Sequence, residues 1–179
     1  MSVIKYERRY AKQVADLLNN YLPFQEENEQ TIDEAGGVQL LAVEDGEVIG
    51  YIAGYAMGDV TIEFPYFHEE LSPLITTLKQ GVCYYTSHLV VHPNARGKGI
   101  GKQLVARYME AVKQKADVVV VVGWVKSDTN KWDAEKQFMS HGFTHKLYIK
   151  RYFEPYNVYC PSCQGTCYCD ANIVWKILS

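Results

Sequence analysis

The spacing of apolar and polar positions changes along the chain, and each change marks an element that the sequence predicts. Apolar and polar residues alternate over Val38–Val43 and Glu47–Met57, which predicts two strands, and Asp45-Gly46 between them is a strong signal for a two-residue hairpin turn. The β-branched run Asp117–Trp124 lacks polar alternation and is typical of a strand buried on both faces. Helical spacing is found elsewhere in the chain. Together these patterns predict an α/β fold (α+β, mixed sheet), in which helices accompany a sheet of parallel and antiparallel strands.

The remaining patterns place further strands and helices between these. Strands are expected at Val3–Tyr6, Tyr84–Val91, Thr144–Phe153 and Asn172–Leu178. Helices are expected at Arg9–Leu22, near Thr31, from about Glu69, after Gly101 and at Lys131–Met139, the last capped by Gly142. Residues 58–81 are interpreted as an insertion and residues 154–170 as a long loop. Because no repeat or linker interrupts the pattern, we interpret residues 1–179 as one domain.

The most distinctive local pattern is a glycine-rich turn between a strand and a helix. The expected strand Tyr84–Val91 leads through Pro93 into Arg96-Gly97-Lys98-Gly99-Ile100-Gly101, and apolar residues then recur at helical spacing. Glycines let backbone N–H groups approach a phosphate closely, and a helix N-terminus adds about half a unit of positive charge. The turn is therefore interpreted as a pyrophosphate cradle, flanked by the basic side chains of Arg96, Lys98 and Lys102.

Two familiar phosphate-binding motifs do not fit this turn. A P-loop needs four residues between its first glycine and a Gly-Lys-Ser/Thr, and the turn has neither that spacing nor the hydroxyl. A Rossmann fingerprint needs Gly-x-Gly-x-x-Gly and an acidic residue about twenty positions later. Here the turn reads Gly97-x-Gly99-x-Gly101, and Asp117 lies before a strand rather than at its end. A plain glycine-rich surface loop is the structural alternative.

The pattern that fits is Arg/Gln-x-x-Gly-x-Gly/Ala, carried by Arg96, Gly99 and Gly101 after a strand ending in Leu89-Val90-Val91. It resembles the pyrophosphate-binding motif of the GNAT superfamily of acetyl-CoA-dependent N-acetyltransferases, and the order of elements matches that fold over essentially the whole chain. The resemblance implies one central mixed sheet flanked by helices, in which the strand before the turn splays from the next strand to admit acyl-CoA. It implies acetyl-CoA as the acyl donor, bound by Leu89, Val90, Val91, Arg96, Gly97, Lys98, Gly99, Ile100, Gly101 and Lys102.

The resemblance also implies how acetyl transfer would proceed. In the family a backbone N–H of the splayed strand, here near Leu89–Val91, stabilises the oxyanion. Many relatives place a Glu or a water-holding residue early in that strand, where this chain has Tyr85. His88 is the nearest side chain that titrates near neutrality, so Tyr85 and His88 are candidates for handling the proton of the amine. A strand histidine packed for structural reasons is the alternative for His88.

One catalytic group of the family is missing. Relatives often read Asn-x-x-Ala-x-x-x-Tyr-x-x-x-Gly-Phe in the next helix, and the Tyr protonates the departing thiolate. This chain has Lys131, Ala134, Phe138 and Gly142-Phe143 at those places. The proton would then come from another group such as Tyr148, or from water. A third alternative is a protein that binds acyl-CoA without turnover.

Charge is distributed unevenly along the chain. From Gln13 to Leu78 there are thirteen Asp and Glu and no Lys or Arg, so this window carries about −13 and the rest about +10. The basic part holds the glycine-rich turn and suits the phosphates of coenzyme A. In the family the acidic part shapes the acceptor pocket, so a cationic amine of a small molecule or peptide is expected, with a solvated acidic surface as the alternative. The absence of a basic stripe interleaved with aromatics disfavours nucleic acid.

Four of the five cysteines fall within ten residues of the loop before the final strand. Cys160, Cys163, Cys167 and Cys169 can supply the four thiolates of a tetrahedral zinc ion. C-x2-C is a familiar zinc-knuckle spacing, whereas C-x3-C-x-C crowds a single ion, and the spacing matches neither common ferredoxin pattern. One zinc ion, a reduced metal-free loop and a labile disulfide all stay open. In the family this loop lies at the acceptor end of the site.

The chain is expected to be a cytoplasmic protein with no membrane partner. No apolar run approaches the roughly eighteen residues of a membrane span, the N-terminus turns polar too early for a signal peptide, and the odd cysteine count argues against a secreted disulfide framework. We interpret the chain as an acetyl-CoA-dependent N-acetyltransferase that acts on a primary amine. The alternative is a non-catalytic acyl-CoA-binding or metal- or redox-sensing protein. The sequence leaves monomer or homodimer undetermined.

Overall fold

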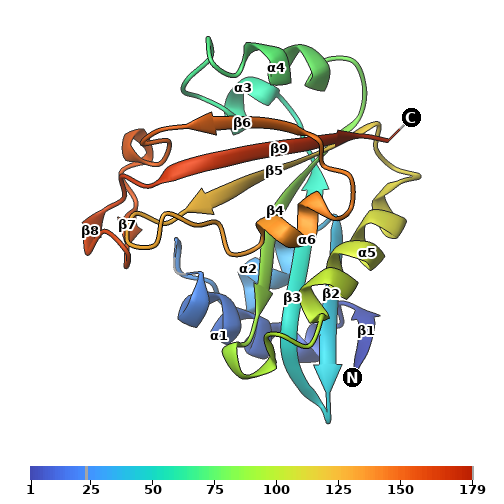
Figure 1. The fold of residues 1–179 in the computed structure, drawn as a ribbon. Coiled ribbons are helices and arrows are strands. Elements are labelled where there is room, and N and C mark those ends of the chain that lie inside the picture. Colours follow the sequence, from blue (N-terminus) through green and yellow to red (C-terminus); the bar gives the residue numbers. More distant parts are fainter. Residues whose placement is uncertain (23, 179) are drawn as a thin grey trace.

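One seven-stranded mixed sheet organises the protein in the computed structural model, which describes residues 1–22 and 24–178 (Figure 1). The strand order is β1-β2-β3-β4-β5-β9-β6, and all neighbours are antiparallel except β4 and β5. The strands are β1 Ser2–Lys5, β2 Val38–Glu44, β3 Glu47–Ala56, β4 Cys83–Val91, β5 Val118–Val125, β6 His145–Ile149 and β9 Asp170–Ile177, with β7 Tyr159–Cys160 and β8 Gly165–Thr166 as a separate hairpin. The predicted central mixed sheet is confirmed.

Helices cover both faces of this sheet. They are α1 Ala11–Tyr21, α2 Glu29–Glu34, α3 Val60–Glu63, α4 Ser72–Leu78, α5 Ile100–Val112 and α6 Glu135–Met139, with 3-10 turns at Arg8–Tyr10, Pro93–Ala95 and Glu154–Tyr156. In β5, Val119 and Val121 pack into the core under α5, whereas Val118 and Val120 pack into the core that contains α4. This strand is therefore buried on both faces, as its sequence predicts. None of the helices in the described ranges is long and apolar enough to cross a bilayer.

The sheet opens between its two parallel strands. β4 pairs with β5 only where Cys83–Thr86 faces Val118–Val121, and the rest of β5 pairs with β9 alone. On its other side, the register of β4 on β3 skips Ser87, between Thr86 and His88, which makes a β-bulge. Figure 1 shows β5, β9 and β6 turning away from β2, β3 and β4. The predicted splay is thus confirmed, and the bulge marks its start at Ser87.

The β2–β3 turn has the backbone conformation that its sequence predicts. Asp45 and Gly46 take φ values of 51° and 84°, both in the left-handed region that a two-residue type I′ turn requires. Gly142 also takes a positive φ of 81°, just beyond the end of α6. At both turns the identity of one or two residues determines the backbone conformation.

Element boundaries near the C-terminus differ from those expected. The expected helix from Lys131 starts only at Glu135, because Trp132 lies flat on Gly123, where an added Cβ would stand 2.2 Å from the indole ring. The strand expected to reach Phe153 ends at Ile149, because Arg151 takes a φ of 53° and its N–H donates to Asp170. The insertion contains the additional short helix α3, and the long loop contains the β7–β8 hairpin.

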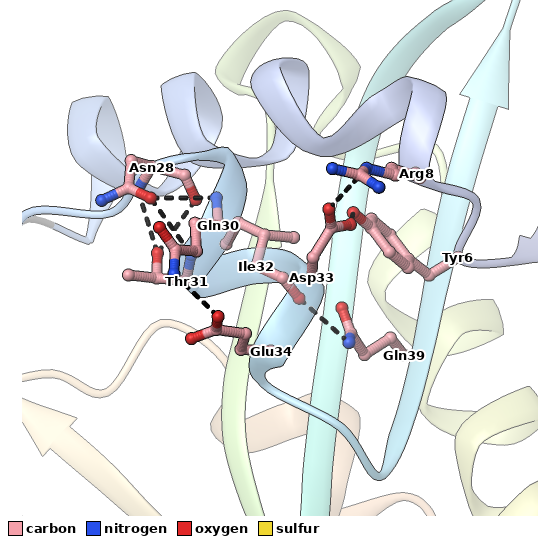
Figure 2. A network of polar contacts seen from close by, with 9 residues as sticks. All are labelled: Tyr6, Arg8, Asn28, Gln30, Thr31, Ile32, Asp33, Glu34 and Gln39. Carbon is pink, nitrogen blue, oxygen red and sulfur yellow. Dashed lines mark hydrogen bonds and ion pairs between the residues drawn. The ribbon is translucent and has the colours of Figure 1, made fainter.

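Polar side chains anchor the short helix α2 (Figure 2). The side chain of Asn28 accepts from two N–H groups of the first turn, and the Thr31 hydroxyl accepts from the N–H of Asn28, which forms a capping box. Asp33 pairs with Arg8 at 2.9 Å and also accepts from the hydroxyl of Tyr6. These bonds fix the acidic α1–α2 region against the start of the chain.

Candidate functional site: a cleft and an aromatic pocket at the sheet opening

A cleft of about 520 Å³ lies where β4 and β5 separate. Its walls come from β4, the far part of β5, the N-terminal turn of α5, α6 and the end of α1. Of the ten predicted acyl-CoA contacts, the structure brings together Leu89, Val90, Val91, Arg96, Gly97, Gly99, Ile100, Gly101 and Lys102 in this lining. Lys98 is exposed and lies outside it.

The glycine-rich turn presents an uncapped helix N-terminus to the cleft. Gly97 and Gly99 take φ values of 78° and 77°, a region that side-chain-bearing residues rarely adopt, and Gly99 is the N-cap of α5. Because glycine has no side chain to cap the helix, the N–H groups of the first turn stay available to a ligand. Arg96 Nε donates to the carbonyl oxygen of Val91 at 3.1 Å, which holds this cation at the same corner.

Two buried polar atoms in the cleft wall have no partner among the described residues. They are the amide oxygen Oε1 of Gln137 and the indole nitrogen Nε1 of Trp124. Gln137 packs against the start of α5, where a Cβ added to Gly101 would lie 3.3 Å from its Cγ. One orphan atom accepts and the other donates, so together they can take an N–H and a C=O of a ligand. The amides of the pantetheine arm of coenzyme A offer both groups, and the cleft therefore fits acetyl-CoA.

The β-bulge gives His88 a defined orientation in the cleft wall. Ser87 Oγ donates to the carbonyl oxygen of Ala53 at 3.3 Å and lies 3.0 Å from Nδ1 of His88. With the hydroxyl proton directed at Ala53, this contact favours the tautomer in which Nδ1 of His88 donates and Nε2 accepts. The imidazole also packs against Tyr51, with ring centroids 6.2 Å apart.

Burial of His88 favours the neutral form of its imidazole. Burial lowers the pKa of His88 below its ordinary value of 6.5, and the negative charge of Glu27 offsets part of this effect. Glu27 is itself buried and accepts hydrogen bonds from Gln25 at 2.7 Å and from the hydroxyl of Thr31 at 2.6 Å. A neutral imidazole near a buried carboxylate can accept a proton from an ammonium group.

A second pocket of about 320 Å³ borders the same opening of the sheet, on the side of α3. We call it the aromatic pocket, and its lining is Tyr55, Ile62, Glu63, Tyr85, Val122, Tyr152, Phe153, Tyr156 and Val158. Tyr85 thus lies in the aromatic pocket, whereas His88 lies in the cleft. Val122 of β5 lines both, so the two spaces adjoin at the point where β4 and β5 part.

The aromatic pocket combines electron-rich rings with one carboxylate. Glu63 accepts a hydrogen bond of 3.0 Å from the hydroxyl of Tyr55. Burial raises the pKa of Tyr55, Tyr85 and Tyr152, so these phenols stay protonated in the neutral range. Neutral aromatic faces beside a carboxylate attract an alkylammonium group through cation–π and ionic contacts.

Most of the acidic window lies away from these two spaces. Asp33 is engaged by Arg8 and Tyr6, as Figure 2 shows, and Glu34 accepts from Gln30 at 2.8 Å. Within the window, Glu63 lines the aromatic pocket and Glu27 acts on His88 by its charge. The acidic window therefore acts on these two spaces through two separate carboxylates, Glu27 and Glu63, rather than through a converging cluster.

The structure does not bring Tyr148 to the cleft. Tyr148 is exposed, its hydroxyl donates to Asp170, and this hydrogen bond raises the pKa of Tyr148. Phe138, at the place of the family's acid, is buried in the cleft wall, stacked on Trp132 at 5.6 Å and edge-on to Phe143 at 5.3 Å. None of these three rings carries a hydroxyl that could replace the acid of the family.

The four predicted metal ligands do come together. The Sγ atoms of Cys160, Cys163, Cys167 and Cys169 lie within 4.8 Å of one another. Burial raises the pKa of Cys160 and Cys167. Partial burial also acts to raise the pKa of Cys163, but hydrogen bonds from Ser127, the N–H of Tyr168 and neighbouring thiols outweigh it and lower the pKa to about 7. The cluster packs against Trp124 of the cleft wall.

Three cleft residues were not singled out from the sequence. Tyr21 lies with its hydroxyl 3.4 Å from Nε2 of His92, and the two rings meet edge to face. Its helical position marked it only as an apolar-face residue. Trp124 follows the run Val118–Val122 and Gly123, and this change in side-chain size was a signal that could have been used. Gln137 carries no pattern that distinguishes it from other polar helix residues.

A mixed sheet that opens between two parallel strands, beside an uncapped helix N-terminus behind a glycine-rich turn, defines an acetyltransferase fold built to bind acyl-CoA. The acetyltransferase (GNAT) family matches this sequence over residues 6–143, and the chain belongs to that family. The resemblance drawn from Arg96, Gly99 and Gly101 is thereby confirmed. A search with the sequence among proteins of curated function finds no match.

Solved structures share the fold at low sequence identity. A putative acetyltransferase from Salmonella typhimurium, determined with its cofactor acetyl-CoA, has a TM-score of 0.70 and 16% identity over 99% of this chain and 94% of that one. Arabidopsis thaliana NAA60 in complex with acetyl-CoA has a TM-score of 0.68 and 13% identity over 98% and 97%. A ribosomal-protein-alanine N-acetyltransferase from Brucella melitensis has a TM-score of 0.66 and 16% identity over 99% of each chain.

Proposed function

We propose that the protein transfers the acetyl group of acetyl-CoA to a primary amine of a cationic small molecule or peptide. The observation that carries this proposal is the position of Val122, which lines both the cleft and the aromatic pocket. A donor in the cleft and an acceptor in the aromatic pocket would approach each other at the opening between β4 and β5. Two similar folds that were determined with acetyl-CoA support the identity of the donor.

The donor would lie along the cleft with its phosphates on the glycine-rich turn. The free N–H groups at the start of α5, together with Arg96 and Lys102, offer converging donors for the pyrophosphate. The backbone of Leu89–Val91, which has no strand partner on the β5 side, and the orphan atoms of Gln137 and Trp124 offer hydrogen bonds to the pantetheine amides. This arrangement directs the thioester toward the β-bulge.

The acceptor would place its ammonium group among the rings of the aromatic pocket. Glu63 supplies the opposite charge, and Tyr55, Tyr85 and Tyr156 supply π faces. A primary amine has an ordinary pKa near 10.4, so it arrives protonated and must lose a proton before it attacks. His88, neutral and with Nε2 free, is the group we assign to accept that proton, directly or through water.

Transfer then follows from positioning and backbone donors. The neutral amine attacks the thioester carbonyl, the C–S bond breaks as the amide forms, and the second proton of the nitrogen passes through water to the departing thiolate. Backbone N–H groups left unpaired on the β5 side of β4 stabilise the oxyanion. The coenzyme A thiol has an ordinary pKa near 8.5 for its class, so its thiolate can leave without a strong acid at Phe138.

A thiol-release assay tests the proposal. The full chain is incubated with acetyl-CoA and a panel of primary amines, cationic and neutral, and free coenzyme A is measured against an amine-free control. We expect amine-dependent release that is strongest for amines bearing an alkyl or aryl ammonium group. A quaternary ammonium analogue should inhibit competitively with the amine and not with acetyl-CoA. Tight acetyl-CoA binding with no release for any amine would instead favour the acyl-CoA-binding alternative.

A further inference from the structure

We propose that Cys160, Cys163, Cys167 and Cys169 bind one Zn²⁺ ion, which holds the loop between β6 and β9 in place as a wall of the aromatic pocket and as a support behind the cleft. The structural role of this wall in acceptor binding rests on the proposed function. The metal site itself does not, because it is carried by the geometry and contacts of the four thiols.

The separations of the sulfur atoms match those of a tetrahedral thiolate site. Sγ of Cys169 lies 3.8 Å from Sγ of Cys160 and 3.5 Å from Sγ of Cys163. Four sulfurs at the usual Zn–S distance of about 2.3 Å stand about 3.8 Å apart at the corners of a tetrahedron. All four Sγ atoms fall within 4.8 Å of one another, so a single ion needs little rearrangement.

The loop is built to bring these thiols to one point. Cys160 ends β7, and Cys163 lies in the hairpin turn, where Gln164 takes a positive φ of 54°. The N–H of Cys167 donates to the carbonyl oxygen of Val158 at 2.8 Å and returns the chain beside β7. The C-x2-C pair and the C-x-C pair thus face each other across a short hairpin.

Backbone donors aimed at sulfur are a second, independent indication. The N–H of Ser127 donates to Sγ of Cys169 at 3.3 Å, and the N–H of Tyr168 donates to Sγ of Cys163 at 3.5 Å. Donors of this kind orient metal-bound thiolates and stabilise their negative charge. Ser127 follows β5, so the contact also ties the cysteine loop to the strand that opens the sheet.

If the four groups are thiolates, as in a zinc site, their burial calls for a bound cation. Cys160, Cys167 and Cys169 are buried in an apolar cluster with Trp124, and Cys163 is half-buried at its edge. Four thiolates cannot be buried together without a compensating charge, because isolated buried anions are strongly destabilised. Divalent zinc supplies that charge and, being inert to redox chemistry, suits a site whose role is structural.

The cysteine loop reaches both parts of the proposed active site. Phe153 and Val158 pack against the cysteines and line the aromatic pocket. Trp124 and Phe24 pack against them from the cleft side, with ring centroids 4.7 Å apart. Removal of the metal would therefore release one wall of the acceptor pocket, while the glycine-rich turn that binds phosphate would stay in place.

Metal analysis of the intact chain tests the site without any activity measurement. Protein purified under reducing conditions and without chelator should contain about one zinc per chain, and Co²⁺ exchanged into it should give the visible bands of a tetrahedral tetrathiolate site. Cys163→Ala should lose the metal, whereas Cys83→Ala, which changes the buried fifth cysteine in β4, should retain it. Circular dichroism on both variants separates lost metal from lost folding.

Several outcomes would overturn the metal site. One is that reduced, folded wild-type protein takes up neither Zn²⁺ nor Co²⁺. Another is that all four thiols are alkylated freely in the presence of excess zinc. A third is that the purified protein contains iron and inorganic sulfide in place of zinc. A separate measurement tests the role of the wall. Chelation should raise KM for the amine at least several-fold more than KM for acetyl-CoA. Equal changes in the two constants would contradict that role and leave the metal content unaffected.

Discussion

The hydroxyl of Tyr55 donates a 3.0 Å hydrogen bond to the carboxylate of Glu63, and this contact joins β3 to the inserted segment in the wall of the aromatic pocket. The bond fixes the only carboxylate among the residues that line this pocket, within the part of the chain that the structure describes. It therefore sets where a cationic group of the acceptor would bind.

Glu63→Gln should weaken amine binding. Replacing the carboxylate by an amide keeps the shape but removes the opposite charge, so KM for a cationic amine should rise about tenfold or more, with KM for acetyl-CoA unchanged. Glu69→Gln is the matched control, because Glu69 is an exposed acid of the same insertion. Steady-state kinetics on both variants check this, and equal KM values for the amine in the two would contradict the role of Glu63.

Gly99→Glu should abolish tight binding of coenzyme A. Gly99 has a φ of 77°, so any side chain there adds backbone strain, and Glu also adds a negative charge beside the phosphates. Gly99→Gln carries the same strain and size without the charge. By calorimetry we expect the Glu variant to bind at least about tenfold more weakly than the Gln variant. Equal affinities of the two variants would show that the phosphates do not bind at this turn.

How far the sequence determined this fold can be judged at individual residues. The turn at Asp45-Gly46, the doubly buried run of β5 and the cradle at Arg96–Gly101 were predicted because each depends on local spacing or on the backbone freedom of glycine. The boundaries of α6 and β6 were not, because they depend on the contact of Trp132 with Gly123 and on a bond from Arg151 to Asp170.

The aromatic pocket escaped prediction for a related reason. Its residues come from β3, the insertion, β4, β5 and the loop after β6, and no local pattern connects Tyr55 with Tyr156 across the chain. Tyr85 was named from its place in the family's strand, but the sequence did not show that it faces a different space from His88.

His88 should give the protein a pH-dependent stability. Burial lowers its pKa in the folded state below the ordinary 6.5, so in acid the unfolded chain takes up the proton more readily. The contribution of His88 is fully present above about pH 6.5 and is lost as the pH falls toward the folded pKa. Thermal unfolding between about pH 5 and pH 7.5 should show a smaller loss of stability in His88→Gln than in wild type.

Two further observations complete this test. His68→Gln changes an exposed histidine in the insertion and should leave the wild-type pH dependence intact. If His88 also accepts the proton of the amine, His88→Gln should lower kcat by about a hundredfold while affinity for coenzyme A is kept. If His88→Gln keeps the wild-type kcat but shows a flatter dependence of stability on pH, His88 is a packed structural residue and not the proton acceptor.

Phe138→Tyr should leave the rate nearly unchanged. The thiolate of coenzyme A is a good leaving group near neutrality, so we expect kcat within about threefold of wild type and the same alkaline limb of the pH profile. Because the new hydroxyl enters a buried site between Trp132 and Phe143, thermal unfolding should accompany the kinetics. A gain of tenfold or more would contradict this expectation and show that an acid is missing at position 138.

We propose that a donor in the cleft and an amine in the aromatic pocket react beside Val122, which lines both spaces. The most direct test uses acetyl-CoA labelled in its acetyl group, with the best cationic amine of the panel, and quantifies free coenzyme A and labelled amide together by mass spectrometry. We expect one labelled amide for each thiol released, and both amounts should fall together in Glu63→Gln at subsaturating amine. Coenzyme A released without labelled amide, or bound acetyl-CoA that no amine discharges, would contradict it.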